Sequence, residues 1–511
     1  MTPMNRVFVL FLLLGVASLT SSKSIGHSST FVPKTFIDST SKPSSTLTTR
    51  EAANDLQTKK DLTSNSQSIT DLSRGGSISI HLSEVKAATI FVILDYLFRQ
   101  AFVRYGINFP SQLGGCCILF IGMLLANVAK PGLGDSIFAM LGPGSALLAK
   151  WLPVFFVPGL AMLPLAPSMG SPIEILKVLL VVVLGFYYSA ATTSFAVLAL
   201  RKMEGSVTSS SDVPQKAANI GPVALPFSSD IVDFLTKGLI LSGAVSIGAT
   251  LMNNDFAIPL RTVFMMFTTF FGYVWGARLP PAFTKIVHPL VTSTVVTHAI
   301  TQLTGLATKS SFNDVLGTYK SGSMKFLSAG AGDILLYLLG PSVVSFAISM
   351  YSRKKTIAEN LLIVCTAMLV ASVGGLFGTA AFVRLLNIGG EAGDVLRKSL
   401  LPRNVTTPLA IAITNILGGD ISQAAAVVVL TGIFAATFGA RFLTSLGITD
   451  PVSRGLGIGA SGQGLGVASI MSEKEAFPFA SLSMVLTAIG ATTLVSIPPI
   501  ANALVKLATG K

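Results

Sequence analysis

Apolar residues fill most of the chain from about residue 85 onward, and polar or Gly/Pro-rich breaks divide them into separate runs. A helix of about 20 residues crosses the hydrocarbon core of a bilayer. Most of these runs also lack the polar face that a helix of a soluble protein turns to water. The pattern predicts an all-α polytopic membrane protein with about 12 transmembrane segments. We expect these segments at 87–105, 111–129, 145–165, 173–200, 231–251, 257–276, 286–307, 327–350, 358–384, 405–419, 421–443 and 476–507.

The first 80 residues have a different pattern. Residues 1–20 place Arg6 ahead of the apolar stretch Val7–Val16, which is typical of a signal peptide and too short to span a bilayer. Residues 21–80 are rich in Ser and Thr, so we expect a disordered, transit-peptide-like segment. It resembles the bipartite presequence of algae with secondary plastids, and Ser28–Pro33 resembles the Phe-containing cleavage motif. Its acidic residues depart from that pattern, and a secretory signal with a disordered luminal tail is the alternative.

A polar linker at 201–229 divides the membrane region into a first part, 85–200, with about four spans, and a second part, 230–511, with about eight. In the second part Pro289, Pro341 and Pro408 interrupt apolar runs, so we expect broken helices there. The segment that starts at His288-Pro289 echoes the one at Thr407-Pro408, although the spacings that follow differ. This echo is compatible with an inverted repeat.

Composition supports the membrane prediction and excludes several function classes. Hydrophobic residues make up 51% of the chain and charged residues 12%, against about 25% charged in ordinary soluble domains. The net charge is +13, but Lys and Arg are scattered through short connections, which favours contact with anionic lipid over nucleic acid. The three cysteines, at 116, 117 and 365, have no metal-ligand spacing, and we expect buried thiols. Because no catalytic set appears, we expect neither an enzyme nor a cofactor or metal site.

Two small, polar stretches lie among the apolar runs of the second part. Non-helical backbone is tolerated at membrane depth only where it lines a cavity or packs on protein, so such stretches indicate a transporter's substrate site. In the first, Asn404, Thr406 and Thr407 precede Pro408, which predicts a half-helix starting inside the membrane with an N-terminus suited to a carboxylate. Arg403 either binds that carboxylate or anchors the helix at the interface. The alternative for the threonines is N-capping without a ligand.

The second stretch is Gly455–Gly466, in which glycine alternates with small residues. Glycines allow a close approach of backbone to a ligand or to a neighbouring helix, and simple helix packing is the alternative to a ligand role. Ser461 and Gln463 are the hydrogen-bonding side chains near its end. We expect this stretch to form a close-packed wall opposite the half-helix, with Gln463 reaching toward the substrate.

Two aspartates in the apolar runs are further candidates. Asp333, at the entrance to the span that carries Pro341, either takes part in transport or caps a helix start. Asp95 lies four residues before Arg99, which predicts an i,i+4 ion pair.

By these motifs, the second part resembles the LrgB family over nearly its whole length. The first part resembles the partner LrgA family, less specifically, through Phe155–Gly159. A fusion of the two behind a plastid presequence is similar to the plastidial glycolate/glycerate translocator family, and the resemblance covers about 85–507. The residues that carry the LrgB resemblance are Gly332-Asp333, Leu339–Pro341, Asn404–Pro408, Asp450–Gly455 and Gly464–Gly466.

The resemblance implies a carrier in the plastid inner envelope of an alga with secondary plastids. It would exchange two small 2-hydroxycarboxylates, glycolate and glycerate, in photorespiration, with proton coupling as an option and a homo-oligomer as a possible assembly. The alternatives are a holin-like or regulatory membrane protein that affects permeability, or a carrier for another monocarboxylate such as pyruvate. Relatives typically carry His where this chain has Gln463, so coupling here would need Asp333 or another group, or would be absent.

Overall fold

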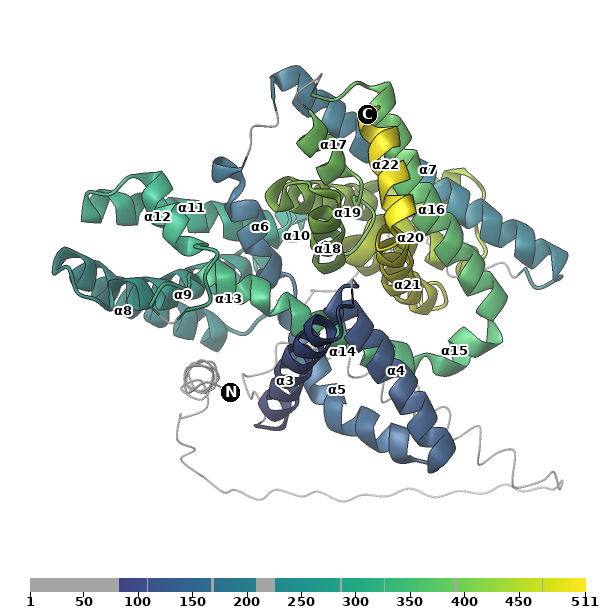
Figure 1. The fold of residues 1–511 in the computed structure, drawn as a ribbon, viewed down its shortest axis with the longest axis horizontal. Coiled ribbons are helices and arrows are strands. Elements are labelled where there is room, and N and C mark those ends of the chain that lie inside the picture. Colours follow the sequence, from purple (N-terminus) through teal and green to yellow (C-terminus); the bar gives the residue numbers. More distant parts are fainter. Residues whose placement is uncertain are drawn as a thin grey trace, which may run out of the picture. The chain divides into compact units, whose positions relative to one another are not determined.

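The computed structural model describes residues 82–107, 109–166, 170–207, 226–284, 287–325, 327–389, 393–470 and 472–511 (Figure 1). The predicted signal peptide, the segment 21–80 and most of the linker lie outside these residues. By their contacts the residues form two units, 81–218 with 233–511, and 1–80 with 219–232. The second unit is described only over 226–232, so the account below concerns the first unit.

Every regular element among the described residues is a helix and none is a strand, which confirms the predicted all-α membrane fold. Among them, eight helices are long and apolar enough to cross a membrane, and a bent pair makes a ninth. The eight are α4 (Ser111–Ala129), α7 (Pro172–Met203), α8 (Ser229–Leu251), α9 (Ala257–Ala277), the joined α13 (Ala331–Tyr337) and α14 (Leu339–Ser352), α16 (Leu361–Leu385), α19 (Ile421–Ser445) and α21 (Phe477–Val495). In the bent pair, α5 (Leu133–Trp151) meets Val154–Leu165 at 53°.

Eleven of the twelve predicted segments fall on a helix or a helix pair. The bounds of the other, 145–165, are wrong, because α5 begins at Leu133 and the predicted segment covers only its end together with three short helical elements. Three predicted segments are not among those nine spans. Two of them correspond to the long helices α3 (Leu82–Arg104) and α11 (Pro289–Thr308), and the third corresponds to the short helix α18 (Thr407–Leu417). The last predicted segment is two helices, α21 and α22 (Pro498–Thr509). The short elements are η1 (Val154–Phe156), α6 (Val157–Ala161), η2 (Leu163–Leu165), α10 (Pro281–Thr284), α12 (Phe312–Tyr319), α15 (Lys354–Glu359) and α17 (Asp394–Leu400).

Helices α3, α4 and α5 pack around α14, so helices of the predicted first part enclose one of the second (Figure 1). A hydrogen bond joins the Ser145 hydroxyl to the Ser345 carbonyl at 3.2 Å. At the other end of α5, Asp135 accepts from the Tyr351 hydroxyl at 2.9 Å and pairs with Lys354 at 2.7 Å. The predicted Asp95–Arg99 ion pair is also formed, at 2.7 Å. The division into LrgA-like and LrgB-like domains stays a prediction.

The long Gly-rich helix α20 (Pro451–Ser469) packs among α7, α19 and α21. A Cβ atom at Gly455 or Gly459 would overlap the backbone of α21, and one at Gly457 would overlap Ser194 of α7. Gly462 faces Ala435 of α19 in the same way. Glycine is therefore required at these positions for close helix packing, as expected for small residues between membrane helices.

Buried ion pairs hold the first half of α20. Asp450 caps the helix by accepting from the Ser453 N–H at 2.9 Å, and it pairs with Arg201 of α7 at 3.0 Å. Arg454 forms a two-pronged pair with Glu473, at 2.6 and 3.0 Å. A carboxylate thus lies against each of these two buried arginines and balances its charge.

The prolines start or interrupt helices as predicted. Pro408 lies in the first turn of α18, and Pro289 in the first turn of α11, where the His288 ring accepts from the Leu290 N–H at 3.2 Å. Pro341 follows the junction of α13 and α14. In both halves of the second part a short helix leads into a Pro-started helix. The helices that follow differ in length, and the inverted repeat stays a prediction.

Candidate functional site

The two polar stretches singled out in the sequence meet in the structure. The turn before α18 lies against the interrupted part of α20, in the group formed by α18, α19, α20 and α21 (Figure 1). The Asn404 side-chain amide donates to the carbonyls of Ala460 on α20 and Ala371 on α16, both at 3.3 Å. The Gln463 side-chain amide donates to the Arg403 carbonyl at 2.5 Å. The half-helix and the Gly-rich stretch are therefore joined through side chains from both.

Arg403 is fully buried, which contradicts its alternative role as an anchor at the membrane interface. Its Nε–H donates to the Thr379 hydroxyl of α16 at 2.9 Å. Its Nη2 group donates to the Ser189 hydroxyl of α7 at 2.8 Å and to the Gly185 carbonyl. A Cβ atom at Gly185 would overlap the guanidinium, so the close approach of α7 depends on glycine there. The guanidinium is thus held in place between α7 and α16.

Three polar atoms of this turn have no hydrogen-bond partner in the described part of the chain. They are Nη1 of Arg403, Oδ1 of Asn404 and Oγ1 of Thr406, on residues that are 0%, 2% and 7% exposed. A buried polar group left without a partner costs about 1–3 kcal/mol, and more when it is charged. Unlike Arg201 and Arg454, Arg403 has no carboxylate within ion-pair distance among the described residues. The turn therefore offers donors and an acceptor, with one uncompensated positive charge.

The start of α18 adds the field of a helix N-terminus. Thr406 is the N-cap residue, but its side chain makes no capping bond, and its carbonyl accepts from the N–H groups of Leu409 and Ala410 at 3.0 and 2.8 Å. The alternative of a pure capping role for Thr406 is therefore wrong. Thr407, in the first turn, is 4% exposed. Anions are favoured at such an N-terminus because the peptide dipoles sum to a partial positive charge.

Ser461 and Gln463 are the predicted site residues on α20, and only Gln463 reaches the turn before α18. The Ser461 hydroxyl donates to the Gly457 carbonyl one turn earlier in α20, at 2.7 Å, so its hydrogen is used within the helix. Gln463 interrupts α20, with φ of 52° and ψ of −149°. Such a conformation is strained for any residue other than glycine and costs about 1–3 kcal/mol. The strain is tolerated at the point where the Gln463 amide reaches the turn that holds Arg403.

Asp333 has the surroundings of a capping residue. Its carboxylate accepts from the N–H groups of Ser321, Gly322 and Gly330 at 2.8–2.9 Å and from the Ser321 hydroxyl at 3.0 Å. These bonds close the segment before α13 onto the helix start. Of the two roles considered for Asp333, the geometry favours the structural one.

Sequence reasoning missed the residues that hold the guanidinium. Gly185 and Ser189 lie four apart on α7, and Gly375 and Thr379 lie four apart on α16, where the Asn404 amide packs against Gly375. Residues four apart share one face of a helix. Two small–x–x–x–small pairs on apolar runs are the sequence signal for these positions.

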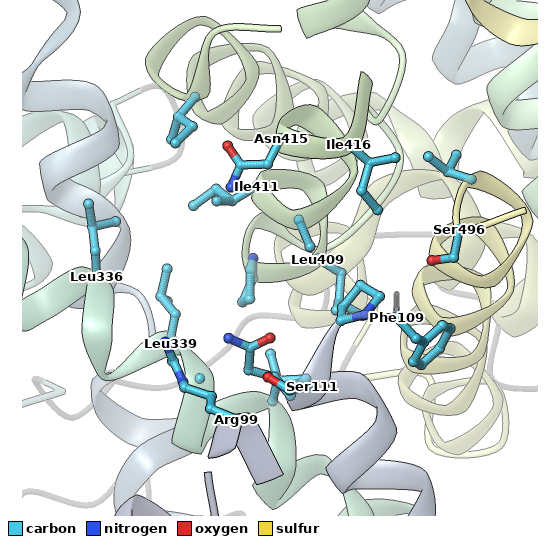
Figure 2. Close-up of a pocket in the computed structure, with 18 of the residues that line it drawn as sticks. Arg99, Phe109, Ser111, Leu336, Leu339, Leu409, Ile411, Asn415, Ile416 and Ser496 are labelled. Atoms are coloured by element: carbon cyan, nitrogen blue, oxygen red, sulfur yellow. The ribbon is translucent and has the colours of Figure 1, made fainter. Parts of the chain in front are cut away.

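A large open cavity lies beside α18. It has a volume of about 940 Å³, and Pro408 and Leu409 of the first turn of α18 are part of its wall. Figure 2 shows Leu409, Ile411 and Asn415 of α18 around this space, with Leu339 and Arg99 across from them. Within the described residues, no group of three or more His, Cys, Asp and Glu side chains could hold a metal ion.

A comparison with protein-family models matches residues 269–502 to the LrgB-like family. The chain is also 30% identical over 420 residues to plastidal glycolate/glycerate translocator 1, chloroplastic, of Arabidopsis thaliana. This match covers 81% of this chain and 79% of the relative. No solved structure matches the chain. Because the two sequences are 30% identical over about four-fifths of each chain, the protein belongs to the plastidal glycolate/glycerate translocator family of LrgB-like membrane proteins.

Proposed function

We propose that this protein is a secondary carrier that exchanges glycolate and glycerate across the inner envelope membrane of a plastid, as a step of photorespiration. The observation that carries the proposal is the 30% sequence identity to the Arabidopsis translocator over 81% of this chain and 79% of the relative. The carrier makes and breaks no covalent bond and needs no cofactor. Both substrates are small monocarboxylates with a hydroxyl on the neighbouring carbon, which fixes the chemistry that a binding site must supply.

The turn before α18 supplies that chemistry. The free Nη1 group of Arg403 donates to the substrate carboxylate in a charge-assisted hydrogen bond. The free Oδ1 of Asn404 accepts from the substrate hydroxyl, and the free hydroxyl of Thr406 is a further partner. The hydroxyl of Thr407, in the first turn of α18, completes the set. Gln463 holds the Arg403 carbonyl and lies beside the substrate. Ser461 contributes as part of the close-packed wall of α20.

The site is closed to solvent in this conformation, because Arg403, Asn404 and Thr406 are all at least nine-tenths buried. Substrate therefore enters when the helices separate on one side at a time. The open cavity beside α18 is the route from one face. Its volume of about 940 Å³ is far larger than a two- or three-carbon acid requires, which suits an entrance better than a binding site. Pro408 and Leu409 of the first turn of α18 line the cavity, whereas Arg403 is not among its lining residues.

We base the assignments of targeting, domains and assembly on the sequence. Residues 1–80 direct the protein to the plastid of an alga with secondary plastids. The helices of 85–200 form the LrgA-like domain and those of 230–511 the LrgB-like transport domain, in a protein that assembles as a homo-oligomer. Asp333 has a structural role, because four donors occupy its carboxylate.

Uptake of labelled glycolate into liposomes that hold the purified protein tests the function. We expect saturable uptake that is stimulated by internal glycerate. A holin-like pore would instead pass unrelated small solutes without saturation. A carrier for pyruvate would show stronger competition by pyruvate than by glycerate. Absence of saturable uptake above empty liposomes would refute the proposal.

Thr406→Val tests the site separately from the fold. Valine has nearly the shape of threonine, and the hydroxyl that it removes is buried without a partner. Removing such a group is neutral or stabilising by about 1 kcal/mol. We therefore expect an unchanged or higher unfolding temperature together with slower glycolate exchange. Normal exchange by a stable Thr406→Val protein would exclude this hydroxyl from the site.

A further inference from the structure

We propose that the open cavity beside α18 binds a long-chain fatty acid in its carboxylate form, and that this ligand inhibits transport. The carboxylate lies on the guanidinium of Arg99, and the acyl chain lies along the apolar wall of the cavity (Figure 2). The binding does not depend on the proposed function. The inhibition does, because it acts through the helix that begins at the proposed substrate site.

The cavity is too large for a two- or three-carbon acid, but it suits a longer molecule. Its volume of about 940 Å³ lies within the range of about 300–1,000 Å³ that is typical of sites for larger organic ligands. Its walls come mainly from α3, α4, α13, α14, α18, α21 and α22. Arg403 and Asn404 are not among the lining residues. A ligand in the cavity and a substrate at the turn before α18 therefore occupy different places.

Most of the cavity wall is apolar, and part of this apolar surface is uncovered. Ile107, Met324 and Ile416 line the cavity and are 46%, 46% and 44% exposed. They lie in the connection after α3, in the segment before α13 and in the last turn of α18. An acyl chain that covers them is removed from water together with them, which is favourable. Each CH₂ group buried in this way strengthens binding about 4-fold, a gain that a two-carbon acid cannot make.

Arg99 of α3 supplies the positive charge. Among the residues that line the cavity it is the single Lys, Arg or His. Its Nε–H donates to Oδ2 of Asp95 at 2.7 Å, and its guanidinium lies 5.0 Å from the centre of the Tyr337 ring. A Cβ atom at Gly340 would overlap its Nη2 group, so α14 packs closely on it as well. Three helices thus orient the guanidinium, and in the described part of the chain neither Nη group makes a hydrogen bond.

The two carboxylates at the cavity leave this guanidinium able to bind an anion. Asp95 is fully buried and is not a lining residue, whereas the Arg99 side chain is 34% exposed. The ion pair therefore turns its cation toward the cavity. Asp333 does line the cavity, but its carboxylate already accepts four hydrogen bonds.

One oriented guanidinium in an apolar cavity fits a single-chain carboxylate. The two free Nη groups can both donate to the head group in charge-assisted hydrogen bonds. A neutral lipid would leave Arg99 unused, and a small acid would leave the apolar wall uncovered. A two-chain anionic lipid has more apolar bulk than a cavity of this size takes.

The position of the cavity explains why a ligand there inhibits transport. Pro408 and Leu409, in the first turn of α18, form part of its wall, and Leu339 of α14 lies across from them (Figure 2). A fatty acid between these two helices opposes any movement of α18 toward α14. Because it does not touch Arg403, it should lower the maximal rate of exchange and leave KM for glycolate unchanged.

Photolabelling of the wild-type protein tests the site. The protein is held in liposomes of phosphatidylcholine and labelled with palmitate that carries a diazirine in its chain, and the labelled peptides are identified by mass spectrometry. We expect labels on 331–343 and 408–416, which unlabelled palmitate removes. Hexadecanol should compete at least about 10-fold less well, because it lacks the bond to a charged group. Equal competition by hexadecanol, or labels outside the cavity only, would overturn the inference. Equal competition by phosphatidylglycerol would overturn the choice of a single-chain ligand.

The matching variant combines Arg99→Gln with Asp95→Asn, so that no buried carboxylate is left without its partner. Arg104→Gln is the control, because Arg104 is an exposed cation on the same helix and does not line the cavity. We expect the double variant to lower labelling of the cavity at least about 10-fold and the control to leave it unchanged. Labelling that is unchanged in the double variant would refute the role of Arg99. If the double variant does not insert, the wild-type competition decides.

Glycolate exchange in the same liposomes tests the inhibition. We expect palmitate to lower the maximal rate in the wild type and in Arg104→Gln, and to have at least about 10-fold less potency on the double variant. Equal inhibition of all three proteins would overturn the inhibitory role. A raised KM for glycolate in the double variant, with labelling unchanged, would assign Arg99 to the substrate route instead. If no saturable uptake occurs at all, the proposed function fails, and the photolabelling still decides the site.

Discussion

Thr379→Val should weaken substrate binding indirectly, because Thr379 contacts the guanidinium of Arg403 and not the substrate. The Thr379 hydroxyl accepts the Nε–H bond of Arg403 at 2.9 Å and donates to the Gly375 carbonyl at 2.6 Å. A hydrogen bond to a charged group is worth about 1.5–3 kcal/mol. If that energy serves to orient the guanidinium toward the carboxylate, its loss raises KM by about 10- to 100-fold, at 1.4 kcal/mol per factor of ten. The maximal rate per inserted protein should change much less.

Thr366→Val is the matched control for this variant. Thr366 lies on the same helix and makes the same type of bond one turn back, from its hydroxyl to the Leu362 carbonyl at 2.8 Å, without contact to Arg403. Thr379→Ser should restore a low KM, because serine retains the hydroxyl. The measurement is the concentration dependence of glycolate exchange into glycerate-loaded liposomes. If KM for Thr379→Val equals that for Thr366→Val within twofold, Thr379 does not position the guanidinium.

Three further predictions concern residues around the site. Asp333→Asn should lower the unfolding free energy by about 2 kcal/mol, because several hydrogen bonds to a carboxylate weaken, while exchange per folded protein stays unchanged; slower exchange by the folded variant would contradict the structural role. Gln463→Gly should leave the unfolding temperature unchanged or raise it, because glycine relieves the strained backbone, and should slow exchange, because the amide is lost; the two assays are run on the same preparation. Asn415→Cys, in a chain whose native cysteines are replaced by alanine, should react with a water-soluble thiol reagent and lose exchange, and retained exchange after complete labelling would exclude the cavity as the route.

Much of the fold could be predicted because membrane helices are encoded locally. An apolar run of about 20 residues implies a helix whatever lies beside it. The half-helix at Thr407 followed from Pro408, since proline in the first turn is pre-organised for a helix start. The capping role of Asp333 could also be predicted as one of two alternatives, because the N–H groups that donate to its carboxylate belong to the adjoining segment.

The surroundings of the candidate site could not be predicted in this way. Arg403 was recognised as a candidate, but its acceptors lie 24 residues earlier on α16 and 214 to 218 residues earlier on α7. No local pattern indicates which apolar helices will meet. The position of the break in α20 was hidden as well, because glycine is frequent throughout 455–466 and the strained residue is Gln463. Ser461 was assigned to the site from its polarity, although its hydroxyl bonds within its own helix.

The acceptors of Arg403 also bear on how the parts of the chain work together. Gly185 and Ser189 lie on α7, outside the residues 269–502 that match the LrgB-like family model. Thr379 lies inside that match. The guanidinium is therefore oriented by one helix from each side of the predicted linker, and the correct docking of α7 is a condition for the geometry of the site. A change that displaces α7 should consequently weaken carboxylate binding even when every residue of the matched region is intact, because Nη2 would lose both of its acceptors and the buried charge would turn away from the start of α18.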